Sequence, residues 1–378
     1  MASLANAWAG RGHRVTVVTL NGDPSFYPLA PGVEHCALGV ACPSHSLAER
    51  WINNLRRMRG LRRTIHRVDP DVVISFLDAT NVVTLLATIG FKVPVIVCEH
   101  NDPSQRYCPL AWRILRLLTY PFAEAVTFLT RDALENMRWL VGERGRVMPN
   151  PVSVPDGDDE PVATNPVRRI IAMGRLEPVK GFDYLLNAFH QVAKTHPDWV
   201  LVILGEGRLR RQLEQQIEQL GLSVRVDLHG RVQDPFRWLR SGDLFVMSSR
   251  FEAFPCALCE AMACGLPAIS FDCPSGPRAI IRDGIDGVLV FAADTNALAA
   301  AMERLMSDAS ERRRLASRAP EVLQRFSLES VLRRWDELFD FCGAPARGSS
   351  ATREATSGRG YSVSSTAANR MRAPRCFR

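Results

Sequence analysis

Short runs of apolar residues alternate along this chain with longer amphipathic segments. The runs at 71–77, 94–98, 169–173 and 199–204 are rich in Val, Ile and Leu, which is typical of strands buried on both faces of a sheet. The segments between them, such as 182–195, carry apolar residues at helical spacing. Strands that alternate with helices predict an α/β fold with parallel sheets covered on both faces.

A polar, proline-rich segment, 153–167, divides this pattern into two halves and is typical of a linker. We expect two Rossmann-like domains that face each other across a ligand-binding cleft. The expected parts are the first domain at 1–152, the second at 168–325, a helix at 326–342 that could pack back on the first domain, and a disordered tail at 343–378.

The beginning of the chain has its own pattern. Residues 3–12 are predicted to be helical and 14–20 to form a strand. The segment 21–48 contains four prolines and is predicted to be rich in loops.

Composition limits the class of protein. A length of 378 residues suits two domains, and 46% hydrophobic with 23% charged residues is globular. No apolar run is long enough for a membrane span, and no signal peptide is recognised, so we expect a cytoplasmic protein with reduced cysteines. Seven arginines and one glutamate in residues 343–378 account for most of the net charge of +7, so the charge does not indicate nucleic-acid binding.

No metal site is expected. Cys256-x-x-Cys259 lies on an apolar helix without a second pair, which favours small buried side chains over redox or metal chemistry. Asp156-x-Asp158 lies in the linker.

The stretch 249–267 follows a predicted strand and carries two glutamates. Glu252 lies on the loop, and Glu260 lies in a short apolar helix that begins near Cys256. A carboxylate buried in that helix needs a hydrogen-bonding partner, and the carboxyl end of a parallel strand is where ligands bind. The alternative is that both glutamates are structural.

Two cations, Arg175 and Lys180, flank a turn that Gly181 closes just before a helix. Cations beside a helix N-terminus suit a diphosphate, although a solvated charged loop is the alternative. Gly205-x-Gly207 lacks the third glycine of a dinucleotide-binding fingerprint, but it allows backbone to approach a ligand.

Over about residues 1–341 the sequence resembles the family 4 glycosyltransferases, which are retaining enzymes of the GT-B fold. The resemblance rests on Gly174-Arg175-x4-Lys180-Gly181, on Gly205-Glu-Gly207 and on Glu252-x7-Glu260. It implies that Arg175 and Lys180 neutralise the donor diphosphate, that Glu252 contacts the donor sugar and that Glu260 binds the ribose. Further implied donor contacts are Gly174, Gly205, Gly207, Gly230 beside the base, and the main chain near Phe254, Pro255, Cys256, Ala257 and Leu258.

The N-terminal half is expected to hold the acceptor. The segment 99–102 follows a strand and is expected to face the cleft, where His100 could contact the donor sugar or the acceptor, or be an ordinary loop histidine. Helices at 51–65 and 112–118 combine apolar and arginine faces. They could lie on an anionic membrane near a lipid-diphosphate acceptor, or be ordinary Rossmann helices.

Several short segments resemble, more narrowly, the bacterial N-acetylgalactosaminyltransferases that extend polyprenyl-diphosphate-linked glycans. They are 26–29, 71–76, 101–103, 258–263 and 272–277. The resemblance implies UDP-N-acetylgalactosamine as donor and retention of configuration, with no metal or other cofactor. Fixed cations and helix N–H groups would stabilise the charge that develops on the β-phosphate.

Two departures from the family pattern leave alternatives open. Ala253 replaces a usual glycine after Glu252. The chain also begins inside the first helix, so the first strand and its glycine-rich loop are missing, and we expect the true start to lie upstream. The alternatives are an inactive sugar-nucleotide-binding protein and a GT-B sugar-nucleotide 2-epimerase, which would need acid/base carboxylates and a histidine at C2.

Overall fold

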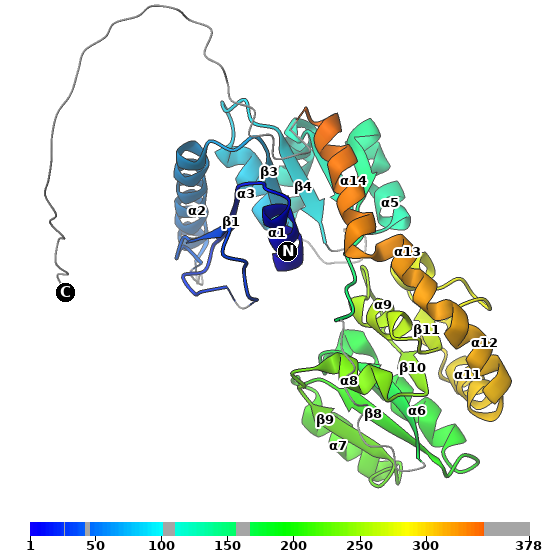
Figure 1. Ribbon diagram of the computed structural model, residues 1–378. Helices are drawn as coiled ribbons and strands as arrows, with labels where there is room; N and C mark the ends of the chain where they lie inside the picture. Colours follow the sequence, from blue (N-terminus) through cyan, green and yellow to red (C-terminus); the bar gives the residue numbers. More distant parts are fainter. Residues whose placement is uncertain (26, 42–45, 101–109, 156–166, 344–378) are drawn as a thin grey trace, which may run out of the picture. The chain divides into compact units, whose positions relative to one another are not determined.

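The computed structural model describes residues 1–25, 27–41, 46–100, 110–155 and 167–343 (Figure 1). The predicted linker and tail therefore lie largely outside the described residues, as do Phe26 and the segment 101–103.

A parallel sheet of six strands organises the C-terminal half, with the strand order β12-β11-β10-β7-β8-β9. Consecutive side chains of a strand pack into hydrophobic clusters on opposite faces of the sheet. In β7, Ile170 and Ala172 pack on one face, and Ile171 packs on the other. The prediction of a parallel sheet buried on both faces is confirmed. The strands are β7 (Arg168–Met173), β8 (Trp199–Leu204), β9 (Val226–Gly230), β10 (Leu244–Met247), β11 (Ala268–Asp272) and β12 (Gly287–Phe291).

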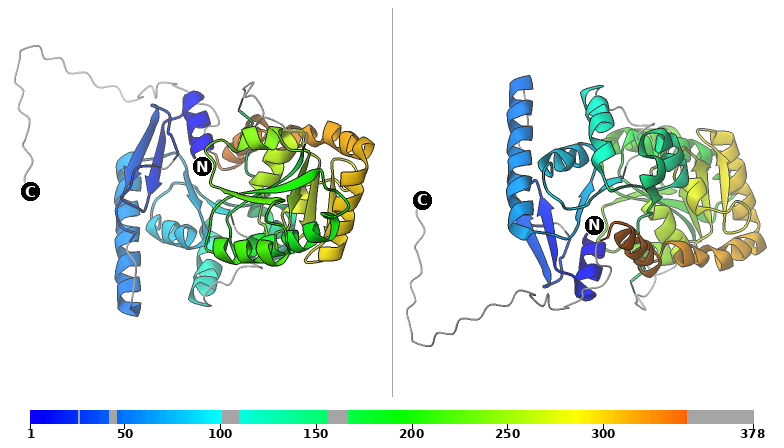
Figure 2. Two further views of the ribbon diagram at one scale, coloured as in Figure 1. Left: turned by 90° about the horizontal axis from the view of Figure 1, so that it is seen from below. Right: turned by 90° about the horizontal axis from the view of Figure 1, so that it is seen from above.

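Helices cover both faces of this sheet (Figure 2). On one face lie α6 (Phe182–Val192), α7 (Arg210–Gln219), α11 (Thr295–Ser307) and α12 (Ala309–Arg318). On the other lie α8 (Pro235–Arg240), α9 (Cys256–Ala263), α10 (Pro277–Ile280), η4 (Ala319–Glu321) and α13 (Val322–Phe326). A short turn, η3 (Pro178–Lys180), precedes α6.

The strands of the N-terminal half form two separate parallel sheets. β1 (Val15–Thr19) pairs with β2 (Val33–Ala37) in a two-stranded sheet, whereas β3 (Val73–Phe76), β4 (Val95–Glu99), β5 (Ala125–Phe128) and β6 (Gly145–Val147) form a second sheet in that order. Among the described residues no strand pairs with the free edge of β1 or of β3. The strand β2 lies inside 21–48, which was predicted only to be loop-rich, so this strand was not predicted.

The helices of this half are α1 (Ala2–Gly10), α2 (Leu47–Val68), α3 (Asp78–Ala87), α4 (Leu110–Thr119) and α5 (Arg131–Val141), with the short turns η1 (Tyr120–Phe122) and η2 (Gly142–Arg144). α2 begins earlier than predicted because the Ser46 hydroxyl caps it, accepting a hydrogen bond from the backbone N–H of Glu49 at 3.1 Å. In the described residues no helix is both long and apolar enough to cross a membrane.

The last described helix, α14 (Leu328–Phe341), belongs to the core of the N-terminal half. Its Trp335 ring packs edge-on against Trp8 of α1, with ring centroids 5.4 Å apart, and the same cluster contains Ile96 of β4. The chain thus returns to the N-terminal half after completing the C-terminal sheet (Figure 1).

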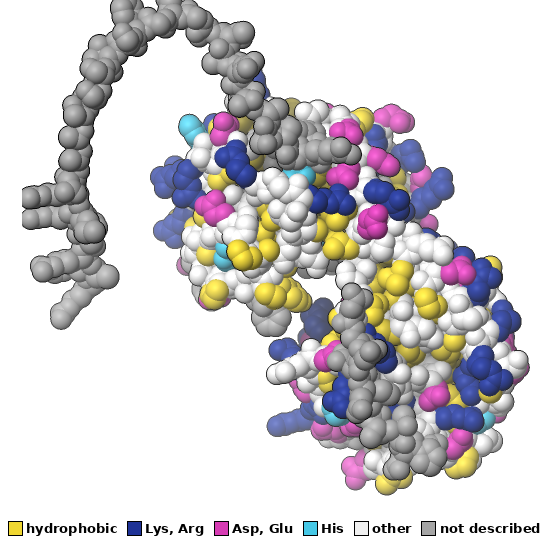
Figure 3. Space-filling model, viewed as in Figure 1, with side chains coloured by type: hydrophobic (Ala, Val, Ile, Leu, Met, Phe, Trp, Pro, Cys, Tyr) yellow, Lys and Arg dark blue, Asp and Glu magenta, His cyan; other side chains and the backbone are white. Residues whose placement is uncertain are grey.

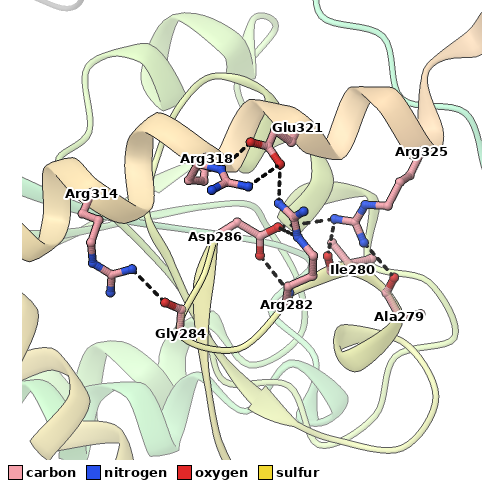
Figure 4. A network of polar contacts seen from close by, with 9 residues as sticks. All are labelled: Ala279, Ile280, Arg282, Gly284, Asp286, Arg314, Arg318, Glu321 and Arg325. Atoms are coloured by element: carbon pink, nitrogen blue, oxygen red, sulfur yellow. Dashed lines mark hydrogen bonds and ion pairs between the residues drawn. The ribbon is translucent and has the colours of Figure 1, made fainter.

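A buried carboxylate ties the loop before β12 to the helices that follow the sheet (Figure 4). Asp286 is fully buried and accepts hydrogen bonds from the backbone N–H and Nε of Arg282, at 2.7 and 2.6 Å. Arg282 in turn donates to Glu321 of η4, and Arg325 of α13 donates to the carbonyl of Ile280. This network fixes α10 and its flanking loop against α13.

Candidate functional site

The carboxyl ends of four neighbouring strands bring the predicted C-terminal residues to one edge of the sheet. Gly174 follows β7, Gly205 follows β8, Gly230 ends β9, and Glu252 follows β10. The first three are joined directly, because Gly174 N–H donates to Leu204 and Gly205 N–H donates to Gly230.

The packing of these strand ends requires a glycine at position 205. Its φ is +145°, and a Cβ there would lie 1.9 Å from the carbonyl oxygen of Gly174. A side chain would therefore displace the turn that precedes Lys180. This close approach of two backbones accounts for Gly205 without any ligand, so its predicted contact with a donor stays a prediction.

Lys180 and Glu252 form an ion pair at this edge. The Lys180 Nζ lies 2.5 Å from Glu252 Oε1, and the Ser249 hydroxyl donates to the same oxygen at 2.7 Å. Glu252 is 9% exposed, so its carboxylate meets two protein donors and little water. The sequence indicated the lysine and the glutamate separately, but nothing in it indicated that they pair or that Ser249 joins them.

The loop that carries Glu252 is also fixed through its backbone. The Glu252 carbonyl accepts a hydrogen bond from Gly276 N–H at 3.1 Å, and Glu252 forms an isolated bridge with Ser275. The Phe254 ring packs edge-on against Phe326, with centroids 5.2 Å apart. Phe254 and Leu258 are thus buried side chains, and only their backbone groups are suited to the predicted ligand contacts.

α9 begins at Cys256, directly after this loop, and no side chain among the described residues caps its N-terminus. Its first-turn N–H groups are of the kind that bind anions. The predicted segment of Pro255, Cys256 and Ala257 forms this helix start. The Cys256 thiol is half-buried, accepts a contact from Asn150 Nδ2 at 3.7 Å, and has a pKa raised by burial. It therefore stays a neutral thiol.

Glu260 lies one turn further along α9, with a half-buried carboxylate. Burial raises its pKa, and within the described part of the chain no hydrogen bond or ion pair joins it to another residue. The sequence predicted that this carboxylate needs a hydrogen-bonding partner, and the described residues do not supply one. The carboxylate is available to hydroxyl groups of a ligand.

Arg175 is exposed and, in the described ranges, forms no side-chain hydrogen bond or ion pair. It lies on the turn between Gly174 and Lys180, so the turn presents one free cation and one cation paired with a carboxylate. Together with the start of α9, this arrangement offers positive charge to an anionic ligand.

His100 lies in the N-terminal half, at the carboxyl end of β4. Its ring packs edge-on against Phe76, with centroids 5.0 Å apart, and lines a small recess together with Thr127, Asn150 and Trp335. Burial lowers the pKa of His100 to about 4, so the imidazole is neutral near pH 7. It can act as a neutral hydrogen-bonding group.

Glu99 was expected to face the cleft with His100, and this was wrong. Its carboxylate is 2% exposed, accepts a hydrogen bond from the Tyr120 hydroxyl and lies 3.4 Å from Arg116 Nε. It anchors α4 and η1 to β4. The neighbouring Asn101 and Asp102 lie outside the described residues.

No cluster of His, Cys, Asp or Glu in the described part of the chain has the arrangement of a metal site. The described cysteines are all free thiols.

Two family models match this chain. "Glycosyl transferase 4-like domain" matches residues 1–152, and "Glycosyl transferases group 1" matches residues 159–322.

Similar curated proteins include two bacterial glycosyltransferases. The chain is 29% identical over 343 residues to an α-1,4-N-acetyl-D-galactosaminyltransferase of Campylobacter jejuni, named for a GalNAc-containing undecaprenol-diphosphate glycan. The alignment covers 89% of this chain and 93% of that relative. An amylovoran biosynthesis glycosyltransferase of Erwinia amylovora is 27% identical, with 90% and 94% covered.

Solved structures share the fold at low identity. Sucrose-phosphate synthase from Thermosynechococcus elongatus superposes with a TM-score of 0.75 at 20% identity, covering 89% of this chain and 91% of that one. Anabaena HepE in complex with UDP gives a TM-score of 0.71 at 19% identity, covering 90% and 96%.

Proposed function

Since this chain belongs to the group 1 glycosyl transferases and has a GT-B-like fold, we propose that it moves N-acetylgalactosamine from UDP-N-acetylgalactosamine to a polyprenyl-diphosphate-linked glycan. That it is a glycosyltransferase follows from the family. The donor and acceptor are taken from the Campylobacter jejuni relative, whose name contains both the transferred sugar and the undecaprenol-diphosphate carrier.

The observation that carries the donor assignment is the Lys180–Glu252 ion pair, whose glutamate lies on the loop that leads directly into α9. Arg175 and Lys180 would hold the diphosphate, with the first-turn N–H groups of α9 beside them. Glu252, whose second oxygen lies free of the Lys180 contact, would bind hydroxyls of the donor sugar. Glu260 would accept hydrogen bonds from the ribose hydroxyls, which would supply the partner that the described residues do not.

The chemistry follows from where charge develops. As the bond from the sugar to the diphosphate breaks, negative charge grows on the β-phosphate, and the two cations with the α9 N–H groups stabilise it. We propose that the acceptor hydroxyl attacks from the same face and gives its proton to the β-phosphate, so that configuration is retained. The fixed cations supply the positive charge for this step without a metal ion.

On the acceptor side, His100 is proposed to hydrogen-bond the donor sugar or the incoming glycan as a neutral imidazole. The recess that it lines with Thr127 and Asn150 contains polar groups that suit hydroxyls.

Two exposed helix faces support a position at the inner surface of the cell membrane. α2 exposes Trp51, Ile52 and Leu55 beside Arg56 and Arg59. α4 exposes Leu110, Ile114, Leu117 and Leu118. Apolar side chains next to arginines suit an anionic membrane surface, and Figure 3 shows Lys and Arg side chains along the edge that α2 forms.

The experiment is a donor screen on the purified chain. UDP-N-acetylgalactosamine, UDP-N-acetylglucosamine, UDP-galactose and UDP-glucose are each incubated with a polyprenyl-diphosphate-linked oligosaccharide, with and without EDTA. Mass spectrometry detects an added sugar, and NMR of the product gives its anomeric configuration. Transfer from another donor would overturn the sugar assignment. A UDP-dependent rise in melting temperature without transfer would instead indicate a sugar-nucleotide-binding protein, for which the divided N-terminal sheet is the supporting observation.

A further inference from the structure

The turn that carries Lys180 is attached to the segment that leads to Glu252. The Ser248 hydroxyl donates to the Lys180 carbonyl at 3.2 Å, and Arg250 N–H donates to the Val179 carbonyl at 2.8 Å. Gly181, with φ at +63°, lets this contact form, because a Cβ there would lie 2.0 Å from the Ser248 carbonyl oxygen. The two backbones are therefore in direct contact over these residues.

The Arg250 side chain reinforces the attachment from both sides of the turn. Its Nη1 and Nη2 donate to the two carboxylate oxygens of Asp183 at 2.8 and 2.6 Å, in a bidentate arrangement. Nη1 also donates to the Pro178 carbonyl at 2.7 Å. The guanidinium lies 4.2 Å from the centroid of the Tyr184 ring. One side chain thus contacts the residue that opens η3 and two residues in the first turn of α6.

The charges of this pair are fixed near neutral pH. Burial alone would raise the pKa of Asp183, but the hydrogen bonds and the charge of Arg250 lower it overall. The carboxylate therefore stays ionised, and the bidentate contact persists across the range in which a glycosyltransferase would be assayed.

We propose that Arg250 is a positioning residue that sets the place of the Lys180 ammonium relative to Glu252 and to the diphosphate of the donor. The inference rests on the proposed function for its ligand, and on the contacts above for its mechanism. Arg250 holds Pro178 and Asp183, which flank the Lys180 turn, while its own backbone leads to Glu252. Removing it would take away the side-chain contacts that join Pro178 and Asp183 to the segment leading to Glu252.

A purely structural role for Arg250 makes a different prediction. If the guanidinium only stabilised the start of α6, its loss would lower the stability of the protein and leave the affinity for UDP unchanged. If it positions Lys180, its effect on UDP binding must pass through Lys180 and disappear when Lys180 is absent. A double-mutant cycle between the two residues separates these cases.

The experiment measures UDP binding by calorimetry in the full chain for R250A, K180A and the double variant. R138A is the matched control, because Arg138 forms a similar bidentate contact with Glu135 on the surface of α5. We expect R250A to weaken UDP binding about tenfold or more, since a small misplacement of a binding group has large effects. R250K should recover part of the loss, and R250A should add little in the K180A background. R138A should bind UDP as the wild type does.

A second readout does not depend on any ligand. The chain contains three lysines, so ¹³Cε-labelled lysine gives three signals, and K180A identifies the one from Lys180. R250A should move this signal toward the position of a solvent-exposed lysine, and R138A should leave it in place.

The outcomes separate the two proposals. An unmoved Lys180 signal in R250A, or equal effects of R250A on UDP binding with and without Lys180, would overturn the positioning role. A moved signal in a protein whose wild type does not bind UDP would uphold the positioning role and overturn the proposed donor.

Discussion

The Lys180 ammonium lies 2.5 Å from the Glu252 carboxylate, which joins the cation proposed for the donor diphosphate to the carboxylate proposed for the donor sugar. Each residue therefore sets the electrostatic environment of the other, and the two substitutions should affect different steps. Glu252→Gln removes a negative charge near the diphosphate, so the affinity for UDP should be unchanged or tighter. Transfer should fall by about 100-fold or more, because the neutral amide is a weaker acceptor for sugar hydroxyls.

The matched change is Lys180→Ala, which removes the cation and leaves the carboxylate. Here UDP binding itself should weaken by about tenfold or more, since a charge-assisted contact to phosphate is lost. Calorimetry with UDP and initial rates with the sugar nucleotide distinguish the two variants. Weaker UDP binding in Glu252→Gln would show that the carboxylate supports nucleotide binding and would contradict the assignment.

Replacing Glu260 should raise the stability of the protein and weaken its binding of UDP. Burial raises its pKa in the folded protein, so the folded state binds this proton more tightly than the unfolded chain does. As the pH rises from the ordinary glutamate range through the raised value, the free energy of unfolding falls, and the loss is complete above the raised value. Glu260→Gln should therefore raise the urea midpoint at pH 7 and remove this pH-dependent loss.

The same substitution should weaken UDP binding by roughly 10- to 100-fold, because hydrogen bonds from ribose hydroxyls to a charged acceptor are replaced by weaker ones. Urea titrations at several pH values and calorimetry with UDP test both effects on one protein. Deoxyuridine diphosphate lacks one ribose hydroxyl, so the wild type should bind it less tightly than UDP. The variant should bind the two nucleotides with similar affinity. A variant that binds UDP normally would refute the ribose assignment.

His100 should act without titrating in the physiological range. Burial lowers its pKa to about 4 from the ordinary value of 6.5, so the unfolded chain takes up this proton first as the pH falls. Stability should be lost between about pH 6.5 and pH 4, and His100→Gln should flatten this part of the profile. Between pH 6 and 8 the transfer rate should show no step that depends on His100.

For activity, His100→Ala should lower transfer by about tenfold, as expected for one neutral hydrogen bond to a sugar, and leave UDP affinity unchanged. Calorimetry and rate measurements on the same preparation test this. A rate profile with a step near pH 6.5 that vanishes in His100→Gln would indicate a protonated, exposed imidazole and contradict the structure.

Much of the C-terminal half could be predicted because its signals are local. Strand β8 was predicted at its observed bounds, since six consecutive apolar residues between polar turns leave little choice. The candidate residues Lys180, Glu252 and Glu260 follow from motifs with fixed spacing. Their contacts could not be predicted, because the pairing of Lys180 with Glu252 depends on how two strand ends approach each other in space.

The N-terminal half was harder to predict for a physical reason. The strand β2 has the sequence Val-Glu-His-Cys-Ala and lies in a proline-rich segment, so it has almost no apolar run that would predict a strand. Its hydrogen bonding to β1 determines its conformation. Glu99 was misplaced because it follows a strand as ligand-binding residues do. Only the structure reveals Tyr120 and Arg116, from a later helix and turn, closing over its carboxylate.

Replacing Asp286, which lies outside the candidate site, should lower the free energy of unfolding. The carboxylate is fully buried and meets Arg282 at 2.6 Å and Arg325 at 3.6 Å (Figure 4). Asp286→Ala removes this partner from both guanidinium groups and leaves the Arg282 N–H without its acceptor. Because the two arginine side chains are 36% and 30% exposed, the loss should be about 1–3 kcal/mol. The urea midpoint should fall accordingly. Arg314→Gln is the control, because Arg314 is exposed and makes only surface contacts among the described residues, with the Gly284 carbonyl and with Glu311 at 3.5 Å, so its effect should stay within about 0.5 kcal/mol.

Membrane binding by α2 can be tested with two arginine pairs of equal charge. Arg56 and Arg59 are exposed on α2, beside Trp51 and Leu55. Arg211 and Arg313 are exposed on the C-terminal half. Each arginine near an anionic surface contributes about 1 kcal/mol, so R56Q/R59Q should weaken binding to phosphatidylglycerol-containing vesicles by roughly 30-fold.

The R211Q/R313Q variant has the same net charge as R56Q/R59Q, so it controls for a general loss of positive charge. It should sediment with vesicles as the wild type does, and neither variant should bind neutral vesicles strongly. Raising the salt concentration should reduce the difference between the two pairs, because the attraction is screened beyond about 10 Å at 0.1 M. Equal losses in the two variants would mean that α2 has no special role. Attraction to the membrane would then depend on the net charge of the protein. The protein would have to approach a membrane-bound acceptor without using α2.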